Sequence, residues 1–305
     1  MRFLITGASG FIASNLIERL VSEGHDVHAT ERYVTGRYTK TPAGLHYADL
    51  TDYAAMKDAL RFIQPDVIIH LAAKTSVAYS YSHPNEVNET NFLATVNLVE
   101  AARRSLPDLS HFIFAGTTEE YGLTPARPVK ETDTPLPNSP YSVSKLAASE
   151  YVLYMGRAYN FPVSVVRCTN SYGRRGDRNF FVEKALSQML EGSTVRLGDP
   201  KPIRELMYYT DHVEAYLKLI EKGPTGSAFN FSTEEPLTLT DTIELMRKIT
   251  GFKGDIIWHT VPERPSDIID HRIDATKAHR ELGWQARVNL EEGLRLTIDG
   301  LSHEG

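Results

Sequence analysis

The sequence has very little cysteine, no long apolar run and no excess of positive charge. Cys168 is the single cysteine among 305 residues, so no intramolecular disulfide can form, and we expect a cytoplasmic protein. The chain has 33 Lys and Arg residues against 39 Asp and Glu residues, which gives a formal net charge of -6. A negative charge disfavours general attraction to nucleic acid or anionic lipid, so neither is expected as a partner.

The apolar stretches are too short for a membrane-spanning helix. The run at residues 67–73 falls far below the ~20 residues that cross a bilayer. The first seven residues reach a turn too early for a signal peptide, so we expect the mature protein to begin at Met1. With 41% hydrophobic and 24% charged residues, the composition is that of a globular protein of one or two domains.

The first half alternates short apolar runs with longer amphipathic stretches. Strands are expected at 2–6, 26–30, 67–71, 111–116 and 163–167, with helices at 11–23, 53–63, 87–104 and 141–159. This order predicts an α/β fold, a Rossmann-type doubly wound parallel sheet covering residues 1–166. Beyond it the alternation weakens and Gly and Pro become denser, so a second, smaller α/β domain is expected at 167–305.

A glycine-rich loop lies between the first expected strand and the first expected helix. Gly7 and Gly10 allow backbone N–H groups to approach a pyrophosphate, and the small Ala13 allows close packing of helix on strand. The helix N-terminus adds a favourable dipole. The expected cofactor contacts in this loop are Gly7, Ser9, Gly10, Phe11 and Ile12.

Residues after the second strand bear on the choice of cofactor. Glu31 stands near the spacing at which an acid accepts from the adenosine ribose, which favours NAD. Arg32 could instead bind a 2′-phosphate, so NADP remains the less favoured alternative. The pair Asp49–Leu50 is a candidate contact for the adenine, although helix capping is an alternative role for Asp49 and for Asp52.

Tyr141 and Lys145 stand four residues apart at the start of an expected helix, and therefore on one face. A nearby lysine cation favours the phenolate form of a tyrosine. The pair is expected to accept a proton from an alcohol that a nicotinamide oxidises.

The chain resembles the extended short-chain dehydrogenase/reductases, specifically the nucleotide-sugar epimerases and dehydratases, over nearly its whole length. The resemblance is carried by TGASGFIA at 6–13, HLAA at 70–73, Asn91, TTEEYG at 117–122, YSVSK at 141–145, RCTNSYG at 167–173, Arg204 and LGW at 282–284. Ala13 departs from the glycine that most members have. The resemblance implies an NAD-binding domain at 1–166 and a nucleotide-sugar-binding domain at 167–305. It also implies further cofactor contacts from Leu71, Ala72, Ala73 and Lys74, and a homodimer formed through the helices near 87–104 and 141–159.

The segment Thr117–Glu119 resembles the corresponding segment of the sugar 4,6-dehydratases. By that resemblance, Thr117 would bind O4 of the sugar and Glu119 would remove the C5 proton. Thr118 stands where an acid protonates the departing hydroxyl, and a hydroxyl is a far weaker acid that could only relay a proton or orient water. Capping of a helix is the alternative explanation for this loop.

Four residues of the second domain are candidates for substrate binding. Arg204 and Arg264 resemble the diphosphate-binding arginines of the family, and a guanidinium fork matches phosphate oxygens. Asn170 is a candidate donor to a phosphate or hydroxyl, and Asn179 is a candidate for the base pocket. No pattern of metal ligands is recognisable, so no metal is expected.

The sequence therefore predicts an NAD-dependent nucleotide-sugar 4,6-dehydratase, a lyase acting on a nucleotide-diphosphate sugar. The alternatives are a 4-keto-6-deoxysugar reductase, a 4-epimerase and a UDP-glucuronate decarboxylase of the same family. The base and the sugar are not identified by any motif.

Overall fold

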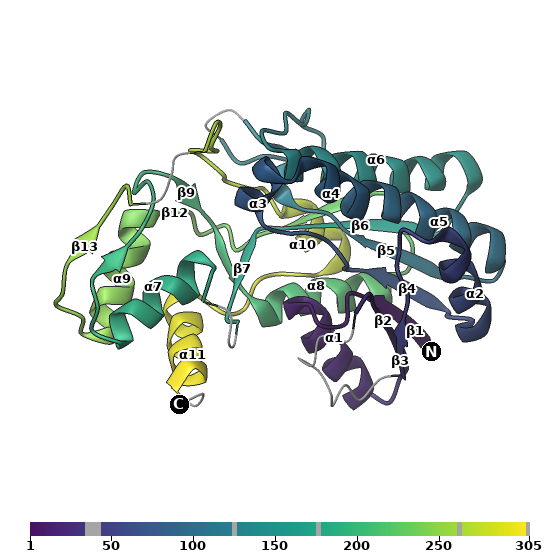
Figure 1. Cartoon of the computed structure of the whole chain (residues 1–305), viewed down its shortest axis with the longest axis horizontal. Coiled ribbons are helices and arrows are strands. Elements are labelled where there is room, and N and C mark those ends of the chain that lie inside the picture. The colour runs from purple at the N-terminus through teal and green to yellow at the C-terminus, as the bar shows by residue number, and fades with distance from the viewer. Residues whose placement is uncertain (34–43, 124–126, 175–177, 261–263, 303–305) are drawn as a thin grey trace. The chain divides into compact units, whose positions relative to one another are not determined.

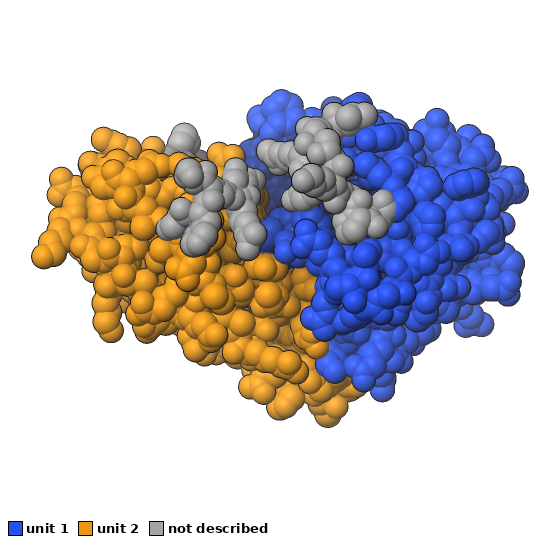
Figure 2. Space-filling view, turned by 90° about the horizontal axis from the view of Figure 1, so that it is seen from below, with its two compact units in different colours: residues 1–122, 137–167, 215–229 blue, residues 123–136, 168–214, 230–305 orange. Residues whose placement is uncertain are grey.

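The computed structural model describes residues 1–33, 44–123, 127–174, 178–260 and 264–302. The chain forms two compact units, which Figure 2 shows in different colours. Unit 1 comprises Met1–Gly122, Pro137–Arg167 and Ala215–Phe229, and unit 2 comprises Leu123–Leu136, Cys168–Glu214 and Asn230–Gly305. The units are thus interleaved in sequence, whereas the predicted division at residues 166 and 167 is a single cut.

Unit 1 is built on a seven-stranded sheet (Figure 1). Its strands are β1 (Arg2–Thr6), β2 (Asp26–Glu31), β3 (Gly44–Tyr47), β4 (Val67–His70), β5 (His111–Ala115), β6 (Val163–Cys168) and β11 (Ala228–Phe231). The spatial order is β11-β6-β5-β4-β1-β2-β3, and the pairs from β3 to β6 are all parallel. Strands β2 and β3 are added on one side of β1, and β4, β5 and β6 are added on the other side. This change in strand order between β1 and β4 confirms the predicted Rossmann-type topology.

Helices cover this sheet on both sides. They are α1 (Phe11–Ser22), α2 (Tyr53–Ile63), α3 (Val77–Ser82), α4 (Pro84–Asn88), α5 (Ala94–Ser105), α6 (Pro140–Tyr159) and α8 (Tyr209–Lys222). Apolar side chains of α2, α5 and α6 form one core with the inward side chains of β1, β4, β5 and β6. Figure 1 shows α1 on the opposite side of the sheet from α5 and α6. In sheets of this type, ligands bind at the carboxyl ends of the strands.

The helix expected at 87–104 is interrupted. A single π-helical turn, η1 (Glu89–Leu93), separates α4 from α5. It places the fully buried Asn91 so that its side chain accepts from Lys74 N at 2.8 Å and donates to Ser144 Oγ at 3.0 Å. Such turns are rare and occur mostly at functional sites.

Unit 2 contains three two-stranded sheets, β10-β7, β12-β9 and β13-β8, with helices packed on them. Its elements are β7 (Asn170–Tyr172), α7 (Phe181–Leu190), β8 (Val195–Arg196), β9 (Ile203–Arg204), β10 (Leu206–Tyr208), β12 (Leu237–Thr238), α9 (Leu239–Thr250), β13 (Ile256–Ile257), α10 (Thr276–Leu282) and α11 (Leu290–Ser302). A second apolar core includes Leu186, Val195, Met246 and Leu294. Within the residues that the structure describes, no helix has the length and apolar character needed to cross a membrane.

Candidate active site

The glycine-rich loop packs so closely on the segment after β4 that no larger residue fits at Gly7. Gly7 has φ +79°, and a Cβ there would lie 2.8 Å from Ala72 Cα. Thr6 fixes this close approach, because its Oγ1 accepts from the backbone N–H groups of Leu71 and Ala72 at 3.1 Å each. Gly10, at the N-cap of α1, offers no side-chain cap. Backbone donors at a helix N-terminus after such a tight glycine turn fit a dinucleotide pyrophosphate.

The other predicted residues of this loop are partly accessible. Ser9, Phe11 and Ile12 all have intermediate exposure. Their positions suit contact with a bound group better than burial in the core.

The carboxyl end of β2 holds the predicted ribose-binding residue. Glu31 is the last residue of β2 and is 8% exposed. The guanidinium of Arg32 lies 4.8 Å from the centre of the Tyr33 ring. Burial opposes ionisation of Asp49, but hydrogen bonds from Thr51 and the charge of Arg32 lower the pKa of its carboxyl. Arg32 is therefore attracted to Asp49 and Tyr33, in addition to any role toward a phosphate.

Asp49 and Asp52 have different roles. The N-cap of α2 is Asp52, which accepts from Ala55 N at 3.0 Å. Asp49 accepts from Thr51 N and Thr51 Oγ1 at 2.9 and 2.8 Å, in a turn before the helix. Leu50 packs against the core beside it.

The loop after β4 is held by buried polar groups. His70 bonds Thr6 Oγ1 at 2.7 Å and Thr95 Oγ1 at 2.9 Å, and burial lowers its pKa to about 3. The imidazole is therefore neutral and joins β1 to α5. Lys74 is held through its backbone by Asn91, and its Nζ lies 2.8 Å from Glu86 Oε1. Leu71, Ala72 and Ala73 lie between these two anchors, at the edge of the glycine loop.

The loop after β5 contains a helix cap and a second, separate carboxylate. The 3₁₀ turn η2 (Thr118–Glu120) begins at Thr117, whose Oγ1 accepts from Glu119 N at 3.2 Å. Glu120 completes the capping box, since its Oε1 accepts from Thr117 N at 3.0 Å. Capping thus explains Thr117 and Glu120, but it does not use the carboxylate of Glu119.

The two glutamates have different surroundings. Glu120 is fully buried and binds Arg167 Nε at 2.8 Å and Ser149 Oγ at 2.7 Å. The neighbouring Glu119 has intermediate exposure, and its charge raises the pKa of Tyr141. Thr118, between Thr117 and Glu119, is buried at 1% exposure.

Tyr141 and Lys145 lie in the first two turns of α6, which starts at the capping residue Ser139. Lys145 is 3% exposed, with its Nζ 4.3 Å from the centre of the Phe114 ring. Burial lowers its pKa to about 8, against an opposing effect of Glu120. Partial loss of the lysine proton is therefore possible near neutral pH.

The expected lowering of the Tyr141 pKa is wrong in direction. Burial raises this pKa, the charge of Glu119 raises it further, and only the hydrogen bond with Thr117 acts in the opposite sense. The spacing to Lys145 was recognisable in the sequence, but the burial of the phenol and the nearness of Glu119 were not.

In unit 2, the structure brings two of the four predicted substrate residues together. Arg204 Nη2 and Arg264 Nη1 both approach Asp267 Oδ1, at 3.3 and 3.7 Å. Asn170 is exposed in β7, and Asn179 is exposed just before α7.

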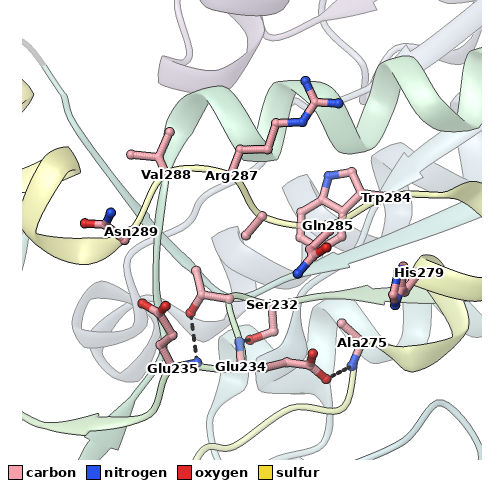
Figure 3. Close-up of a pocket in the computed structure, with 12 residues that line it drawn as sticks. Ser232, Glu234, Glu235, Ala275, His279, Trp284, Gln285, Arg287, Val288 and Asn289 are labelled. Atoms are coloured by element: carbon pink, nitrogen blue, oxygen red, sulfur yellow. Dashed lines mark hydrogen bonds between the residues drawn. The ribbon is translucent and has the colours of Figure 1, made fainter.

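A cavity in unit 2 contains none of the predicted residues. It has a volume of about 140 Å³ and is lined by Ser232, Glu234, His279, Trp284, Arg287 and Asn289 among others. Figure 3 shows Glu234 turned toward Ala275, whose N–H it accepts at 3.1 Å. Ser232, which lines the cavity, donates from its Oγ to Glu205 at 2.5 Å. Glu205 also accepts from Ile273 N at 3.0 Å. Burial raises the pKa of Glu205 to about 7, a feature that no sequence pattern indicated.

The described residues contain no cluster of three or more His, Cys, Asp or Glu side chains placed to hold a metal ion. The predicted catalytic side chains of unit 1 are a phenol (Tyr141), a lysine (Lys145), two hydroxyls (Thr117 and Thr118) and a carboxylate (Glu119).

Comparison with known proteins agrees with this geometry. Residues 4–297 match the family model described as GDP-mannose 4,6 dehydratase. A probable dTDP-glucose 4,6-dehydratase of Sinorhizobium fredii is 31% identical over 334 residues, covering 100% of this chain and 94% of that protein.

Solved structures of epimerases are equally similar. The UDP-glucose 4-epimerase of Thermotoga maritima, determined with UDP-glucose, has a TM-score of 0.92 and 30% identity, covering 100% of this chain and 99% of the other. The UDP-glucose 4-epimerase of Thermus thermophilus, in complex with NAD, has a TM-score of 0.89 and 29% identity, covering 98% of each chain.

The fold and the site define an extended short-chain dehydrogenase/reductase of the nucleotide-sugar dehydratase and epimerase class. Within that class, the chain belongs to the family whose model is described as GDP-mannose 4,6 dehydratase.

Proposed function

We propose that this chain is an NAD-dependent nucleotide-sugar 4,6-dehydratase, which converts a nucleotide-diphosphate hexose into the 4-keto-6-deoxy sugar. The observation that carries the proposal is the carboxylate of Glu119, which is electrostatically coupled to Tyr141 and is distinct from the capping carboxylate of Glu120. An epimerase that acts only at C4 needs no base for a C5 proton, whereas a dehydratase does. The similarity to a dTDP-glucose 4,6-dehydratase supports this choice.

The glycine loop, Glu31 and the loop after β4 would hold the dinucleotide. When held there, NAD would supply reversible hydride transfer between the nicotinamide and the sugar carbons C4 and C6. The tight turn at Gly7 fits such a group, and the placement of Arg32 near Asp49 supports NAD over NADP. A structural relative in complex with NAD agrees with this assignment.

Each catalytic side chain would have one task. Tyr141, bonded to Thr117, would take the O4 proton as C4 is oxidised. The Lys145 cation would stabilise the resulting phenolate. Glu119 would then remove the C5 proton, made acidic by the C4 ketone, and this proton would pass to the C6 hydroxyl, which leaves as water. Thr118 would orient the departing hydroxyl or a water, because its own hydroxyl is too weak an acid to act alone.

The pKa of Tyr141 is raised and the pKa of Lys145 is lowered, so both groups favour their neutral forms before substrate binds. The phenol holds its proton strongly, and the lysine holds its proton weakly. Transfer from the sugar hydroxyl therefore requires that a bound positive group first lowers the pKa of Tyr141. Tyr141 would therefore remove a proton from the sugar only when the cofactor is bound.

The isotopic fate of the sugar tests the proposal. The purified protein is incubated in deuterated water with dTDP-glucose, UDP-glucose, GDP-mannose or UDP-glucuronate, and separately with NAD(P)H and a 4-keto-6-deoxy nucleotide sugar, and the product is followed by mass and NMR. A dehydratase product should lose about 18 mass units in ordinary water and about 17 in deuterated water, because one solvent deuterium replaces the hydrogen at C5, and it should show no net NADH release. An epimer of unchanged mass would support the 4-epimerase alternative. Loss of carbon dioxide from a glucuronate, or consumption of NAD(P)H with a 4-keto sugar, would support the decarboxylase or reductase.

A matched pair of variants assigns the base. Glu119→Gln should stop water loss while C4 oxidation continues, so that a reduced cofactor accumulates and absorbs near ~340 nm. Thr118→Ser keeps the hydroxyl and should retain most of the activity. Full water loss by Glu119→Gln would remove Glu119 from the mechanism.

We also propose where the two ligands bind. The dinucleotide is assigned to the residues of unit 1, and the nucleotide sugar to Asn170, Asn179, Arg204 and Arg264. A cytoplasmic location is part of the same proposal.

We further propose a homodimer formed through the segments 87–104 and 141–159. Large apolar side chains exposed there support it: Leu93, Val143 and Tyr154 are 53%, 47% and 42% exposed. Light scattering of the purified protein tests this, since a monomer mass would contradict it.

A further inference from the structure

A buried histidine lies between two threonine hydroxyls at the carboxyl end of β4. His70 Nδ1 is 2.7 Å from Thr6 Oγ1, and His70 Nε2 is 2.9 Å from Thr95 Oγ1. Thr6 ends β1, and Thr95 lies at the start of α5. All three side chains are buried. The imidazole therefore connects a strand to a helix through hydrogen bonds that are shielded from water.

The backbone after β4 fixes the direction of the first hydrogen bond. Thr6 Oγ1 accepts from the N–H groups of Leu71 and Ala72 at 3.1 Å each. A hydroxyl has two acceptor lone pairs and one proton, so both lone pairs are used. The hydroxyl proton of Thr6 is therefore donated to His70, and Nδ1 of that ring carries no proton.

The second hydroxyl continues the chain in the same direction. Thr95 Oγ1 donates to the carbonyl oxygen of Asn91 at 2.7 Å, so it can accept the proton on His70 Nε2. With the neutral Nε2–H tautomer, each hydroxyl and each ring nitrogen has its partner. The Nδ1–H tautomer and the imidazolium would both direct a second proton at Thr6 Oγ1. Burial and the charge of Lys145 also lower the pKa of His70, to about 3, which agrees with a neutral ring.

One end of this chain supports the glycine loop. Gly7 follows Thr6 in sequence, and a Cβ at Gly7 would lie 2.8 Å from Ala72 Cα. Thr6 Oγ1 holds the N–H of that same Ala72. The position of the Thr6 hydroxyl therefore sets how closely the glycine turn approaches the segment after β4.

The other end supports helix α6. The Asn91 side chain accepts from Lys74 N at 2.8 Å and donates to Ser144 Oγ at 3.0 Å. Ser144 Oγ in turn donates to the carbonyl oxygen of Tyr141 at 2.7 Å. Thr95 thus holds the backbone of Asn91, and the side chain of Asn91 holds the helix turn that contains Tyr141.

We propose that His70, as the neutral Nε2–H tautomer, is a positioning residue that joins the glycine loop to the turn of α6 that contains Tyr141. The inference rests on the proposed function, because it takes the glycine loop as the cofactor site and Tyr141 as the proton acceptor. A buried polar group that loses its partner is costly, so each hydrogen bond of the chain restrains its two partners. His70 acts through these partners and not by contact with the substrate.

Nitrogen NMR tests the tautomer in the unmodified protein. Full-length protein with isotopically labelled histidine is titrated between pH 5 and pH 8. The His70 signals are identified by their loss in His70→Phe or by their shift in Thr95→Val. The expected result is a proton on Nε2, none on Nδ1 and no titration over this range. A proton on Nδ1, or a titration, would overturn the inference.

Two Thr95 variants test the positioning role. Thr95→Val has a similar shape but no hydroxyl, so it breaks the chain toward α6 and leaves the bond between His70 and Thr6. Kinetics with dTDP-glucose, UDP-glucose and GDP-mannose should show kcat lowered about tenfold, with KM and the Kd for NADH changed by no more than about twofold. Thr95→Ser, which keeps the hydroxyl, should recover most of the lost kcat.

His70→Phe breaks the chain on both sides. It should lower kcat and also raise the Kd for NADH about tenfold, measured by fluorescence titration. His111→Phe is the matched control, because His111 is a buried imidazole of the same sheet at the start of β5, where its Nε2 lies 2.9 Å from Ser164 Oγ. The control should leave kcat and the Kd for NADH within about twofold. Circular dichroism shows whether each variant is folded.

The outcomes separate this inference from the proposed function. Unchanged kcat in Thr95→Val, or losses in His111→Phe equal to those in His70→Phe, would overturn the inference alone. If His70→Phe does not fold, the Thr95 variants and the tautomer decide. If the unmodified protein removes water from no sugar, the dehydratase is overturned, and the tautomer and the NADH affinity of His70→Phe still decide the role of His70. If the unmodified protein binds no NADH, both are overturned.

Discussion

The guanidinium of Arg167 and the carboxylate of Glu120 form a buried ion pair at 2.8 Å, with side chains only 4% and 0% exposed. Arg167 is the last residue but one of β6. Glu120 caps the turn that contains Thr117 and Glu119. The Arg167 guanidinium also lies 5.0 Å from the centre of the Tyr121 ring and donates to its hydroxyl at 3.0 Å. The position of the proposed catalytic loop therefore depends on charges that have no contact with water.

This pair gives a prediction about stability. Glu120→Gln should lower the free energy of unfolding by about 3–5 kcal/mol, because it leaves the Arg167 charge buried without its partner. Urea unfolding of the full-length protein, followed by circular dichroism, measures the change. Glu119→Gln, at the adjacent and more exposed position, is the control and should change stability by less than about 1 kcal/mol. Equal effects of the two substitutions would contradict the separate roles of the glutamates.

The glycine loop gives a prediction about cofactor binding. Gly7→Ala should abolish NAD binding, since its Cβ would meet Ala72 Cα at 2.8 Å and its φ is +79°. Gly24→Ala has the same kind of strain, with φ +82°, but nothing lies within 4 Å of its Cβ. Fluorescence titration with NADH should therefore show loss of binding in the first variant and normal binding in the second. Normal binding by Gly7→Ala would show that the loop is a structural turn only.

Substitution of the phenol should affect turnover and not affinity. Tyr141→Phe should reduce kcat by at least about a thousandfold while the Kd for the nucleotide sugar changes by no more than about threefold, because the phenol acts on a proton in the transition state. Pre-steady-state kinetics and calorimetry measure the two quantities. Turnover at the rate of the unmodified protein would remove Tyr141 from the mechanism.

The raised pKa of Glu205 predicts a pH dependence of stability. The folded protein holds this carboxyl proton up to a pKa of about 7, against 4.5 for the free side chain. The folded state therefore binds more protons over this interval, and stability should fall as pH rises from about 4.5 to about 7, by on the order of 3 kcal/mol. Glu205→Gln should lack this component, so that it gains stability relative to the unmodified protein between pH 5 and pH 8.

Urea unfolding at pH 5 and pH 8 checks this expectation, with Glu235→Gln at a nearby exposed position as the control. A parallel pH dependence in Glu205→Gln and the unmodified protein would show that the buried carboxyl is already ionised below neutral pH.

The sequence predicted the parts of the fold that local patterns specify. The strands at 2–6, 26–31 and 67–70 are short apolar runs with clear boundaries, and α2 spans the predicted residues Tyr53–Ile63. The glycine loop was recognisable because it needs particular residues at particular spacing. By contrast, the edge strand β3 is only partly buried, with the pattern expected of a loop.

The site was predictable in its residue types but not in its energetics. Spacing indicated Tyr141 and Lys145, but their pKa shifts arise from burial by segments distant in sequence. The capping role of Glu120 and the pairing of Arg204 with Asp267 depend on which side chains meet after folding. No local pattern contains that information.

The π-helical turn Glu89–Leu93 constrains how the length of this chain can change. Such a turn accommodates one residue more than a regular helix. Deletion of a single residue here would restore regular geometry and rotate α5 by about 100° relative to α4. Asn91 would then no longer face Lys74 and Ser144 while Leu98 and Val99 stayed in the core. The number of residues between the start of α4 and the end of α5 is therefore fixed by contacts on both sides of the π-helical turn. Insertions or deletions should be tolerated in surface loops and not in this segment.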